Sequence, residues 1–370
     1  MRSKSDHRIA VVWLVATAWA FLAVGVAQAD FIFGEPEMLG PGVDSARIEL
    51  WPRLSTDGLS FYFIRTDDYQ GPHELWMSAW VPEDNSWDTA TYLGPWDDVS
   101  SYQSMLSVPG VTTADGIEMF LPLKRVGGCG GVDIWTATRP TVDDPWGAAV
   151  NLGSVVNSST SDTMPWISAD GLELYFSSDR LGGYGSQDLY VTTRESVHDP
   201  WSEPTNLGPA VNSEAWDTRA SLSPDGLLLF FDSHRPGGYG HLDMYVARRA
   251  THSDPWEQPV NVGPVVNATS AEELPLVSPD GSTLFFDSDR LGGLGPHGIW
   301  CAPIIPIVDF NGDEIVDCVD ICIMIDCWGT DDALCDIGPM PWGDGIVDAQ
   351  DLIVLAEYLT TDVNDVNDAG

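Results

Sequence analysis

The sequence predicts an all-β five-bladed β-propeller followed by a small helical module. The first observation is an Asp-Gly turn between two strand-like runs, which recurs with its Asp at positions 57, 115, 170, 225 and 280. Asp-Gly between alternating apolar runs favours a hairpin, because glycine accepts the positive φ of a tight turn. The second observation is the spacing, 58 residues for the first interval and 55 for the other three. Repeats of roughly 40 to 55 residues with strand-like alternation are typical of propeller blades with four strands each.

The N-terminal segment, residues 1–29, is typical of a secretory signal peptide. Basic residues at positions 2, 4 and 8 precede an apolar run over residues 9–26, and an Ala-Gln-Ala cleavage site ends at position 29. A membrane anchor is the alternative, but the run is short for a span and ends in small residues. We therefore expect a secreted protein, extracellular or at the cell surface, with no membrane span after cleavage.

Acidic side chains dominate the charge. The net charge is −40, and cleavage of the signal peptide removes three basic and one acidic residue to leave −42. Nucleic acids and anionic lipids bind basic side chains that displace their counterions, so the composition argues against both as partners. We interpret most of the acidic side chains as aids to solubility.

The third repeat illustrates the four strands expected in each blade. We predict strands at residues 163–168, 172–178, 188–193 and 203–207. The fourth strand lies in a segment, residues 199–213, whose pattern recurs in the neighbouring repeats.

The fifth repeat lacks this fourth strand, and the missing piece lies at the N-terminus. Residues 33–45 match residues 201–213 position by position. We therefore predict that the N-terminal strand completes the last blade and closes the ring, which hides the sheet edges. The propeller is expected to cover residues 30–303.

The turns and loops of repeats three to five resemble those of WD-like, TolB-type β-propeller proteins. The shared motifs are Ser-Pro-Asp-Gly at 223–226 and 278–281, Ser-Asp-Arg at 178–180 and Gly-Gly-Tyr-Gly at 182–185. The first two repeats depart from this pattern. The resemblance implies the propeller fold and protein binding, but no particular reaction.

Four of the five repeats carry an acid eight positions before the turn Asp: Glu49, Asp162, Asp217 and Glu272. Inner strands line the channel of a propeller, so these acids are expected near one mouth. They are candidate catalytic residues of a glycoside hydrolase, which needs two carboxyl groups about 5–10 Å apart, or candidate ligands of a cation or polyol. The alternative is a structural ion pair that joins neighbouring blades, formed with the arginine that recurs at positions 180, 235 and 290. We favour the ion pair, because a feature repeated in most blades serves the fold.

Tryptophan supplies the other candidates, since no Gly-x-Ser-x-Gly or His-Glu-x-x-His motif occurs. Three tryptophans recur with the repeat and are expected in the core between blades: Trp146, Trp201 and Trp256. Five others are candidate platforms for a glycan or peptide ligand: Trp51, Trp80, Trp96, Trp166 and Trp216.

A short linker, residues 304–308, leads into an acidic loop with the spacing of calcium ligands. Oxygen donors fall at loop positions 1, 3, 5, 7, 9 and 12, from Asp309, Asn311, Asp313, Ile315 (through its carbonyl), Asp317 and Asp320. Ca²⁺ takes about six to eight oxygen ligands in such loops. One departure is Glu314 at position 6, where the sharp turn favours glycine.

A second loop is less complete. Its candidate ligands are Asp336, Asp344, Ile346 (through its carbonyl), Asp348 and Asp351. The last four occupy positions 5, 7, 9 and 12, whereas positions 1 and 3 are Met340 and Trp342. Asp336 is therefore predicted to act through an enlarged loop. Helix-like runs over residues 319–328 and 349–359 follow the two loops.

Two calcium loops, each followed by a helix, resemble a type I dockerin, an EF-hand-like module. The resemblance covers residues 309–360 and implies Ca²⁺ as cofactor and a cohesin-like protein as partner, often in polysaccharide catabolism. Positions 10 and 11, which help to select the cohesin in that family, are Cys318-Val319 and Ala349-Gln350. A Cys327–Cys335 disulfide between the loops is a hypothesis, and residues 361–370 are expected to form a flexible tail.

These patterns predict a secreted, non-catalytic binding or scaffold protein. Its propeller would recognise a glycan or protein ligand, and its calcium-dependent module would attach it to a cohesin-type partner. The alternative is a five-bladed glycoside hydrolase with carboxylates at the channel mouth.

Overall fold

The computed structural model describes residues 31–55, 57–69, 72–84, 86–95, 110–306, 308, 310, 316, 318–330, 335–338 and 346–358. The predicted signal peptide and C-terminal tail lie outside these residues. None of the helices in the described part of the chain combines the length and apolar character needed to cross a membrane.

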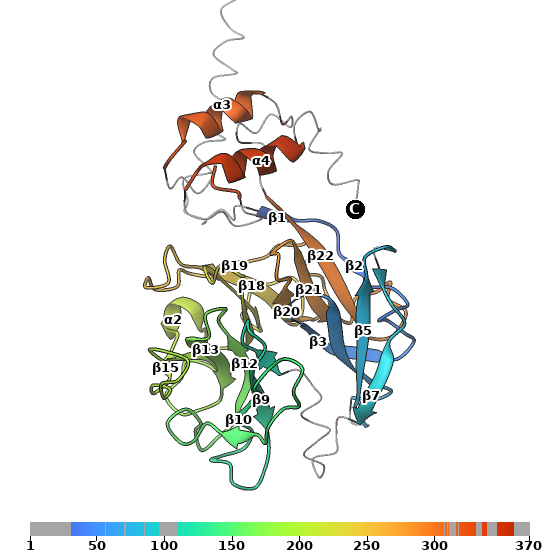
Figure 1. The fold of residues 1–370 in the computed structure, drawn as a ribbon, viewed down its shortest axis with the longest axis vertical. Coiled ribbons are helices and arrows are strands. Elements are labelled where there is room, and N and C mark those ends of the chain that lie inside the picture. The colour runs from blue at the N-terminus through green and yellow to red at the C-terminus, as the bar shows by residue number, and fades with distance from the viewer. Residues whose placement is uncertain are drawn as a thin grey trace, which may run out of the picture.

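Five antiparallel sheets form the five blades of a β-propeller (Figure 1). The first contains β3 (Ile48–Leu54), β4 (Ser60–Thr66), β5 (Glu74–Val81), β6 (Ser86–Trp87) and β7 (Thr91–Pro95). The second contains β8 (Val111–Thr112), β9 (Glu118–Leu123), β10 (Asp133–Thr138) and β11 (Val150–Asn151). The third contains β12 (Asp162–Ile167), β13 (Glu173–Ser178), β14 (Asp188–Thr193) and β15 (Thr205–Asn206), close to the predicted strands.

The fourth and fifth blades repeat the same order. The fourth contains β16 (Asp217–Leu222), β17 (Leu228–Ser233), β18 (Asp243–Arg248) and β19 (Val260–Asn261), and a single helical turn, α2 (Gly208–Val211), precedes it. The fifth contains β20 (Glu272–Val277), β21 (Thr283–Ser288) and β22 (Gly298–Pro306). In each blade the first of these strands is innermost, which places its start at one mouth of the channel and the Asp-Gly turn at the other.

The N-terminal segment closes the ring as predicted. Strand β2 (Glu37–Met38) pairs with β22, and so does β1 (Phe31–Phe33), which extends the contact to the end of β22. Strand β22 runs to Pro306 rather than ending at residue 303, so the predicted linker begins inside a strand. The reason is that β1 covers this end of the strand, pairing Phe31 with Pro306.

The Asp-Gly turns owe their shape to one recurring set of bonds. In the third blade Ser168 Oγ donates to Asp170 at 2.5 Å, and the Leu172 amide donates to the same carboxylate at 3.0 Å. Gly171 has a φ of 73°, a value that costs glycine little. The same bonds join Ser223 to Asp225 and Ser278 to Asp280.

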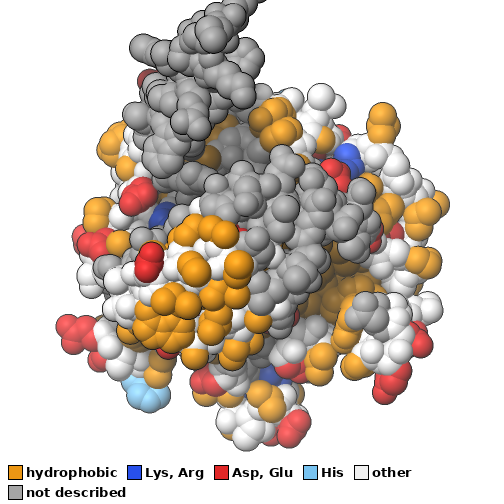
Figure 2. Space-filling view, turned by 90° about the horizontal axis from the view of Figure 1, so that it is seen from above, with side chains coloured by type: hydrophobic (Ala, Val, Ile, Leu, Met, Phe, Trp, Pro, Cys, Tyr) orange, Lys and Arg blue, Asp and Glu red, His pale blue; other side chains and the backbone are white. Residues whose placement is uncertain are grey.

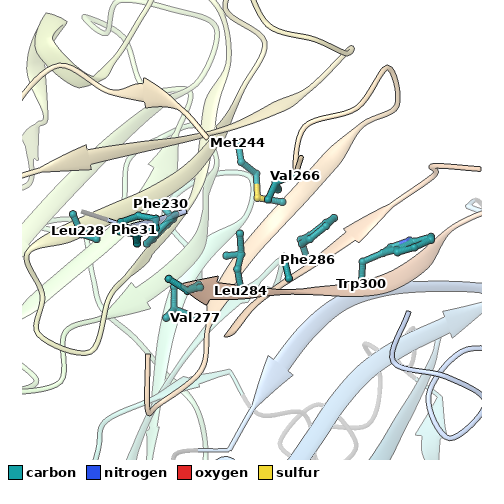
Figure 3. Packing of buried hydrophobic residues seen from close by; sticks show 11 residues of the cluster. Phe31, Leu228, Phe230, Met244, Val266, Val277, Leu284, Phe286 and Trp300 are labelled. Carbon is teal, nitrogen blue, oxygen red and sulfur yellow. The ribbon is translucent and has the colours of Figure 1, made fainter. Parts of the chain in front are cut away.

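The apolar core lies between neighbouring blades. One cluster joins Phe230 and Met244 of the fourth blade to Leu284 and Phe286 of the fifth. Phe31 from the N-terminal strand packs against Phe230, with ring centroids 6.4 Å apart, and Figure 3 shows the two rings side by side. Ring closure therefore buries side chains as well as pairing strands.

The C-terminal region has a separate small core. Helices α3 (Cys318–Asp326) and α4 (Ala349–Tyr358) lie together beyond the end of β22 (Figure 1). Val316, Met324, Val347 and Leu355 are fully buried in their shared cluster. The helices agree with the helix-like runs in the sequence. Cys327 is a free thiol, so the hypothesis of a Cys327–Cys335 disulfide is wrong for this structure.

Candidate functional site

The four acids that recur with the repeat are fully buried, and each is paired with an arginine. The nitrogen–oxygen distances are 2.7 Å for Arg180–Asp162, 2.6 Å for Arg235–Asp217, 3.2 Å for Arg290–Glu272 and 2.8 Å for Arg65–Glu49. The ion-pair interpretation is confirmed. Each pair lies within one blade, whereas we expected it to join two. The arginines do reach back to the segment entering from the preceding blade, where they donate to the carbonyls of Val156, Val211, Val266 and Val43.

Different ion pairs join neighbouring blades. Arg194 lies 2.7 Å from Glu118 of the preceding blade, and Arg249 lies 2.8 Å from Glu173. Both pairs span 76 residues, a constant separation that could have revealed them in the sequence. The guanidinium groups of these two arginines also lie over Trp201 and Trp256, at 4.4 and 4.5 Å from the ring centroids.

The tryptophans divide into core and surface as follows. Trp201 and Trp256 contact Phe120 and Tyr175 of the preceding blade, which confirms their role in the inter-blade core. Trp146 packs against a cluster of the second blade. The five candidate platform residues are less uniform. Trp166 lines the channel, Trp51 stacks on His73, Trp80 packs on Trp87, Trp216 is exposed and Trp96 lies outside the described residues.

The inner strands of four blades share a β-bulge that contains a non-glycine residue with positive φ. These residues are Trp51, Met164, Arg219 and Leu274, with φ between 51° and 58°. Such a conformation is uncommon and persists where neighbours hold it. In three cases the bulge amide donates to a side chain on the second strand of the preceding blade. The acceptors are Ser177 for Arg219 at 3.0 Å, Asp232 for Leu274 at 3.1 Å and Asp287 for Trp51 at 2.9 Å.

Two of these three acceptors, Asp232 and Asp287, are carboxylates. They belong to a cluster of charged side chains that does not recur in every blade. The Arg219 guanidinium lies 3.1 Å from Asp232 and 2.9 Å from Glu273 of the next blade. The side chain of Asp232 is fully buried, whereas those of Arg219 and Glu273 are 21% and 25% exposed. We call these residues, with Asp287 and His297, the mouth cluster, because they lie near the start of the inner strands.

Burial makes two carboxyl groups of the mouth cluster, those of Asp232 and Glu273, weaker acids than usual. It raises the pKa of Asp232 to about 7, although the charge of Arg219 opposes the shift. Burial also raises the pKa of Glu273, again against Arg219. Burial alone would lower the pKa of Arg219, but the charges of Asp232 and Glu273 raise it, so the arginine stays protonated.

His297 links the mouth cluster to the first blade. Its Nε2 lies 3.8 Å from Asp287 Oδ1, and its Nδ1 is 3.1 Å from the Tyr69 hydroxyl. Burial tends to lower the pKa of His297, but the interaction with Asp287 and the charge of Glu273 raise it.

Several buried atoms of the mouth cluster have no hydrogen-bond partner among the described residues. They are Asp232 Oδ1, Asp287 Oδ1, His297 Nε2 and Arg219 Nε. Buried polar groups in native proteins are nearly always paired, with protein, water or a ligand. Sequence reasoning missed the whole cluster, because it compared what the repeats share. Arg219, Glu273 and His297 stand where the third repeat has Met164, Thr163 and Gln187.

The opposite mouth holds a cavity of about 310 Å³ lined by the turn segments of all five blades, together with Arg53 and Trp166. Burial lowers the pKa of Arg53 to about 10. The repeat acids do not line this cavity.

The C-terminal loops show one shared contact. Asp320 Oδ1 accepts a hydrogen bond from the Phe310 amide at 2.8 Å, and Asp351 Oδ1 accepts one from the Ile337 amide at 2.6 Å. Phe310 follows Asp309 in the sequence, and Ile337 follows Asp336, with four more residues between Asp336 and Asp351 than between Asp309 and Asp320. Both position-12 carboxylates are fully buried.

Of the other predicted calcium ligands, the structure describes only Asp348 and Ile346. Asp348 is held near Asp351 and accepts from the Gln350 amide at 2.7 Å, and Ile346 is exposed. Asp309, Asn311, Asp313, Ile315, Asp317 and Asp344 lie outside the described residues. Within the described ranges no group of three or more His, Cys, Asp or Glu side chains is placed to hold a metal ion.

No family model matches the chain, and no curated protein matches it. Among solved structures, TolB from Acinetobacter baumannii is 13% identical to this chain. The match covers 78% of this chain and 67% of the TolB chain, with a TM-score of 0.41. The catalytic domain of Coprinopsis cinerea GH62 alpha-L-arabinofuranosidase is 10% identical over 74% of this chain and 97% of its own, with a TM-score of 0.43. A thermostable family-43 glycoside hydrolase is 12% identical over 74% of this chain and 90% of its own, also with a TM-score of 0.43. These scores are low, so the assignment of a five-bladed propeller rests on the strand pairing above.

Proposed function

We propose that the chain is a secreted, non-catalytic binding protein, in which the propeller recognises a glycan or protein ligand and a calcium-ordered, dockerin-like module attaches it to a cohesin-type partner. The mouth cluster is the observation that carries the first half of this proposal, because it places buried, incompletely paired polar groups at one end of the channel. Secretion follows from the leader-like N-terminal sequence. A role in extracellular polysaccharide catabolism follows from the resemblance of the C-terminal module.

The contacts of Asp320 and Asp351 support the calcium module. Each buried carboxylate accepts a hydrogen bond from the amide of the second residue of its loop, so the two ends of each loop lie close together. Asp309, Asn311, Asp313, Asp317 and the Ile315 carbonyl would hold calcium in the first loop with Asp320. The chemistry fits, because hard oxygen donors in this number are those that Ca²⁺ prefers.

Chelation of calcium is expected to unfold α3 and α4 and to leave the propeller folded, because the acidic loops repel one another without the ion. Far-UV circular dichroism of the mature chain, with calcium and then with EDTA, measures the loss of helical signal. Added calcium should restore the signal, and binding to an immobilised cohesin panel should follow it. A helical signal that is the same in calcium and EDTA would contradict the proposal.

A glycoside hydrolase is the second candidate function. The pKa values of Asp232 and Glu273 make the mouth cluster a better candidate for its catalytic site than the repeat acids. Hydrolysis pairs a carboxylic acid that stays protonated with one that is ionised. Burial raises the pKa of Asp232 and of Glu273, which share one arginine, Arg219. Asp162 and Asp217 each have an arginine of their own.

We expect the mature chain to release no reducing sugar from plant or algal glycans. Reducing-end assays on the wild type and on Glu273→Gln measure this, with Asp162→Asn and Asp217→Asn testing the repeat acids. Turnover by the wild type that falls about 100-fold or more in a folded Glu273→Gln variant would establish the hydrolase instead. A comparable fall in folded Asp162→Asn and Asp217→Asn would move the catalytic site to the repeat acids.

A further inference from the structure

We propose that Arg219 and Glu273 form the polar floor of a carbohydrate-binding site at the mouth of the propeller, with Tyr69 and Trp216 as its aromatic walls. This inference rests on the proposed binding function and names the ligand class and the side chains that receive it. The ligand would be a neutral sugar with adjacent hydroxyl groups.

The fold alone does not require the charges of the mouth cluster. The bulge amide of Arg219 is satisfied by the neutral hydroxyl of Ser177. The equivalent amides of Leu274 and Trp51 are satisfied by Asp232 and Asp287, which are 0% and 1% exposed. A serine would make the same bond without the cost of burying a carboxylate. The extra carboxylates therefore serve something other than the bulge.

What the carboxylates do is hold Arg219 and His297 in place. Asp232 lies 3.1 Å from Arg219, and Asp287 lies 3.8 Å from His297. A guanidinium fixed from behind presents its remaining face to the channel mouth, where the side chain is 21% exposed beside the 25% exposed Glu273. This is the arrangement of a binding floor supported from below, in which the exposed groups are preoriented by buried ones.

The hydrogen-bonding character of this floor selects hydroxyl groups. Arg219 offers only donors, and Glu273, when ionised, offers only acceptors. A cation would be attracted by Glu273 and repelled by Arg219. An anion would be attracted by Arg219 and repelled by Glu273. A hydroxyl both donates and accepts, so two adjacent hydroxyls can bridge the pair. Behind this pair, Asp287 Oδ1 and His297 Nε2 lie 3.8 Å apart, and neither makes a hydrogen bond to the described residues.

Two exposed aromatic side chains flank the floor. Tyr69 and Trp216 are each 51% exposed, and they come from the first and fourth blades. Burial raises the pKa of Tyr69, and the charges of Asp289, Asp287 and Glu273 raise it further, so its hydroxyl lies near these carboxylates. Trp216 packs against His234, with ring centroids 5.2 Å apart. Burial lowers the pKa of His234, and the charges of His241 and Arg219 lower it further. Sugar rings pack their apolar C–H faces on such aromatic surfaces, which supply affinity.

A glycan array probed with the mature, calcium-loaded chain tests the proposal. The array carries neutral plant and algal oligosaccharides, and the best-bound oligosaccharide is then titrated by isothermal calorimetry. We expect binding, with Trp216→Ala and Tyr69→Ala each raising the dissociation constant tenfold or more. Tyr92→Ala is the matched control, because Tyr92 is a similarly exposed tyrosine (48%) on β7, an outer strand of the first blade, and it should leave the constant unchanged.

Arg219→Met should abolish binding, and the two surface variants decide the matter if this variant fails to fold. An array without hits overturns the carbohydrate assignment, and so does a dissociation constant that is equal in wild type, Trp216→Ala and Tyr69→Ala. A basic peptide library provides the second arm. If the chain binds basic peptides through these residues but no glycan, the proposed binding function stands and the ligand class named here is wrong.

Discussion

Replacing Arg235 with methionine is expected to destabilise the propeller by about 3–5 kcal/mol, because a buried carboxylate then loses its cation. Asp217 is fully buried, and its Oδ1 lies 2.6 Å from Arg235 Nη2. The guanidinium also lies over Tyr245, 4.7 Å from the ring centroid, so the variant loses a cation–π contact as well. The shift of the unfolding midpoint in urea, followed by tryptophan fluorescence, measures the effect.

Arg47→Met is the matched control for this variant. Arg47 Nε lies 2.6 Å from Asp67 and its Nη1 lies 2.6 Å from Glu74, distances like that in the buried pair, but the two carboxylate side chains are 80% and 30% exposed. Exposed ion pairs contribute about 0–1 kcal/mol, because water and salt screen them. If Arg235→Met lowers the free energy of unfolding as little as Arg47→Met does, the recurring pairs do not stabilise the fold. Asp217 then has another role.

The propeller could be predicted from sequence because its determinants repeat. Each Asp-Gly turn marks one hairpin, and five turns at intervals of 58, 55, 55 and 55 residues mark five blades. The closing strand was predictable for the same reason, since residues 33–45 carry the pattern of an outer strand and the fifth repeat has none. The end of β22 was not predictable, because Pro303 and Pro306 read as a linker, and only the pairing of Phe31 with Pro306 keeps that segment in the sheet.

The mouth cluster could not be predicted by the same reasoning, because three of its five members depart from the repeat. Arg219 and Asp232 belong to the fourth blade, Glu273 and Asp287 to the fifth and Tyr69 to the first. No single repeat contains the site, and only the ring brings its parts together. The bulge that turns Arg219 toward Glu273 is also a property of backbone conformation that residue types do not reveal.

The repeat acids were recognised in the sequence, and their preferred role was correct in chemistry but not in place. An acid and an arginine that recur together predict an ion pair, which the structure contains. Whether the pair joins two blades depends on the register of neighbouring strands. That register places Asp162 directly opposite Ser178 in its own blade, within reach of Arg180.

Replacing Asp44 with asparagine is expected to stabilise the chain at pH 8 by about 1–2 kcal/mol and to flatten its stability between pH 4 and 7. Asp44 is 2% exposed and accepts from the Ile299 amide at 3.0 Å, where β2 closes the ring. Burial raises its pKa from 3.8 to about 7, with the charge of Glu49 adding to the shift. Because the folded chain holds this proton more tightly than the unfolded one, Asp44 favours folding at acidic pH. That contribution is lost as the pH rises through about 7.

The other blades supply the model for this variant. Asn157, Asn212 and Asn267 occupy the same place and accept from the amides of Ile134, Leu189 and Met244 at 2.8 to 2.9 Å. Their amide nitrogens also donate to the carbonyls of the same residues, a bond that an ionised Asp44 cannot make. Asn212→Asp is the reverse control, and it should introduce a loss of stability with rising pH. Urea unfolding of the wild type and both variants at pH 5 and pH 8 measures the three pH dependences. If Asp44→Asn retains the slope of the wild type, the titration that limits ring closure belongs to another group, and Asp232, whose pKa is also about 7, becomes the next residue to replace.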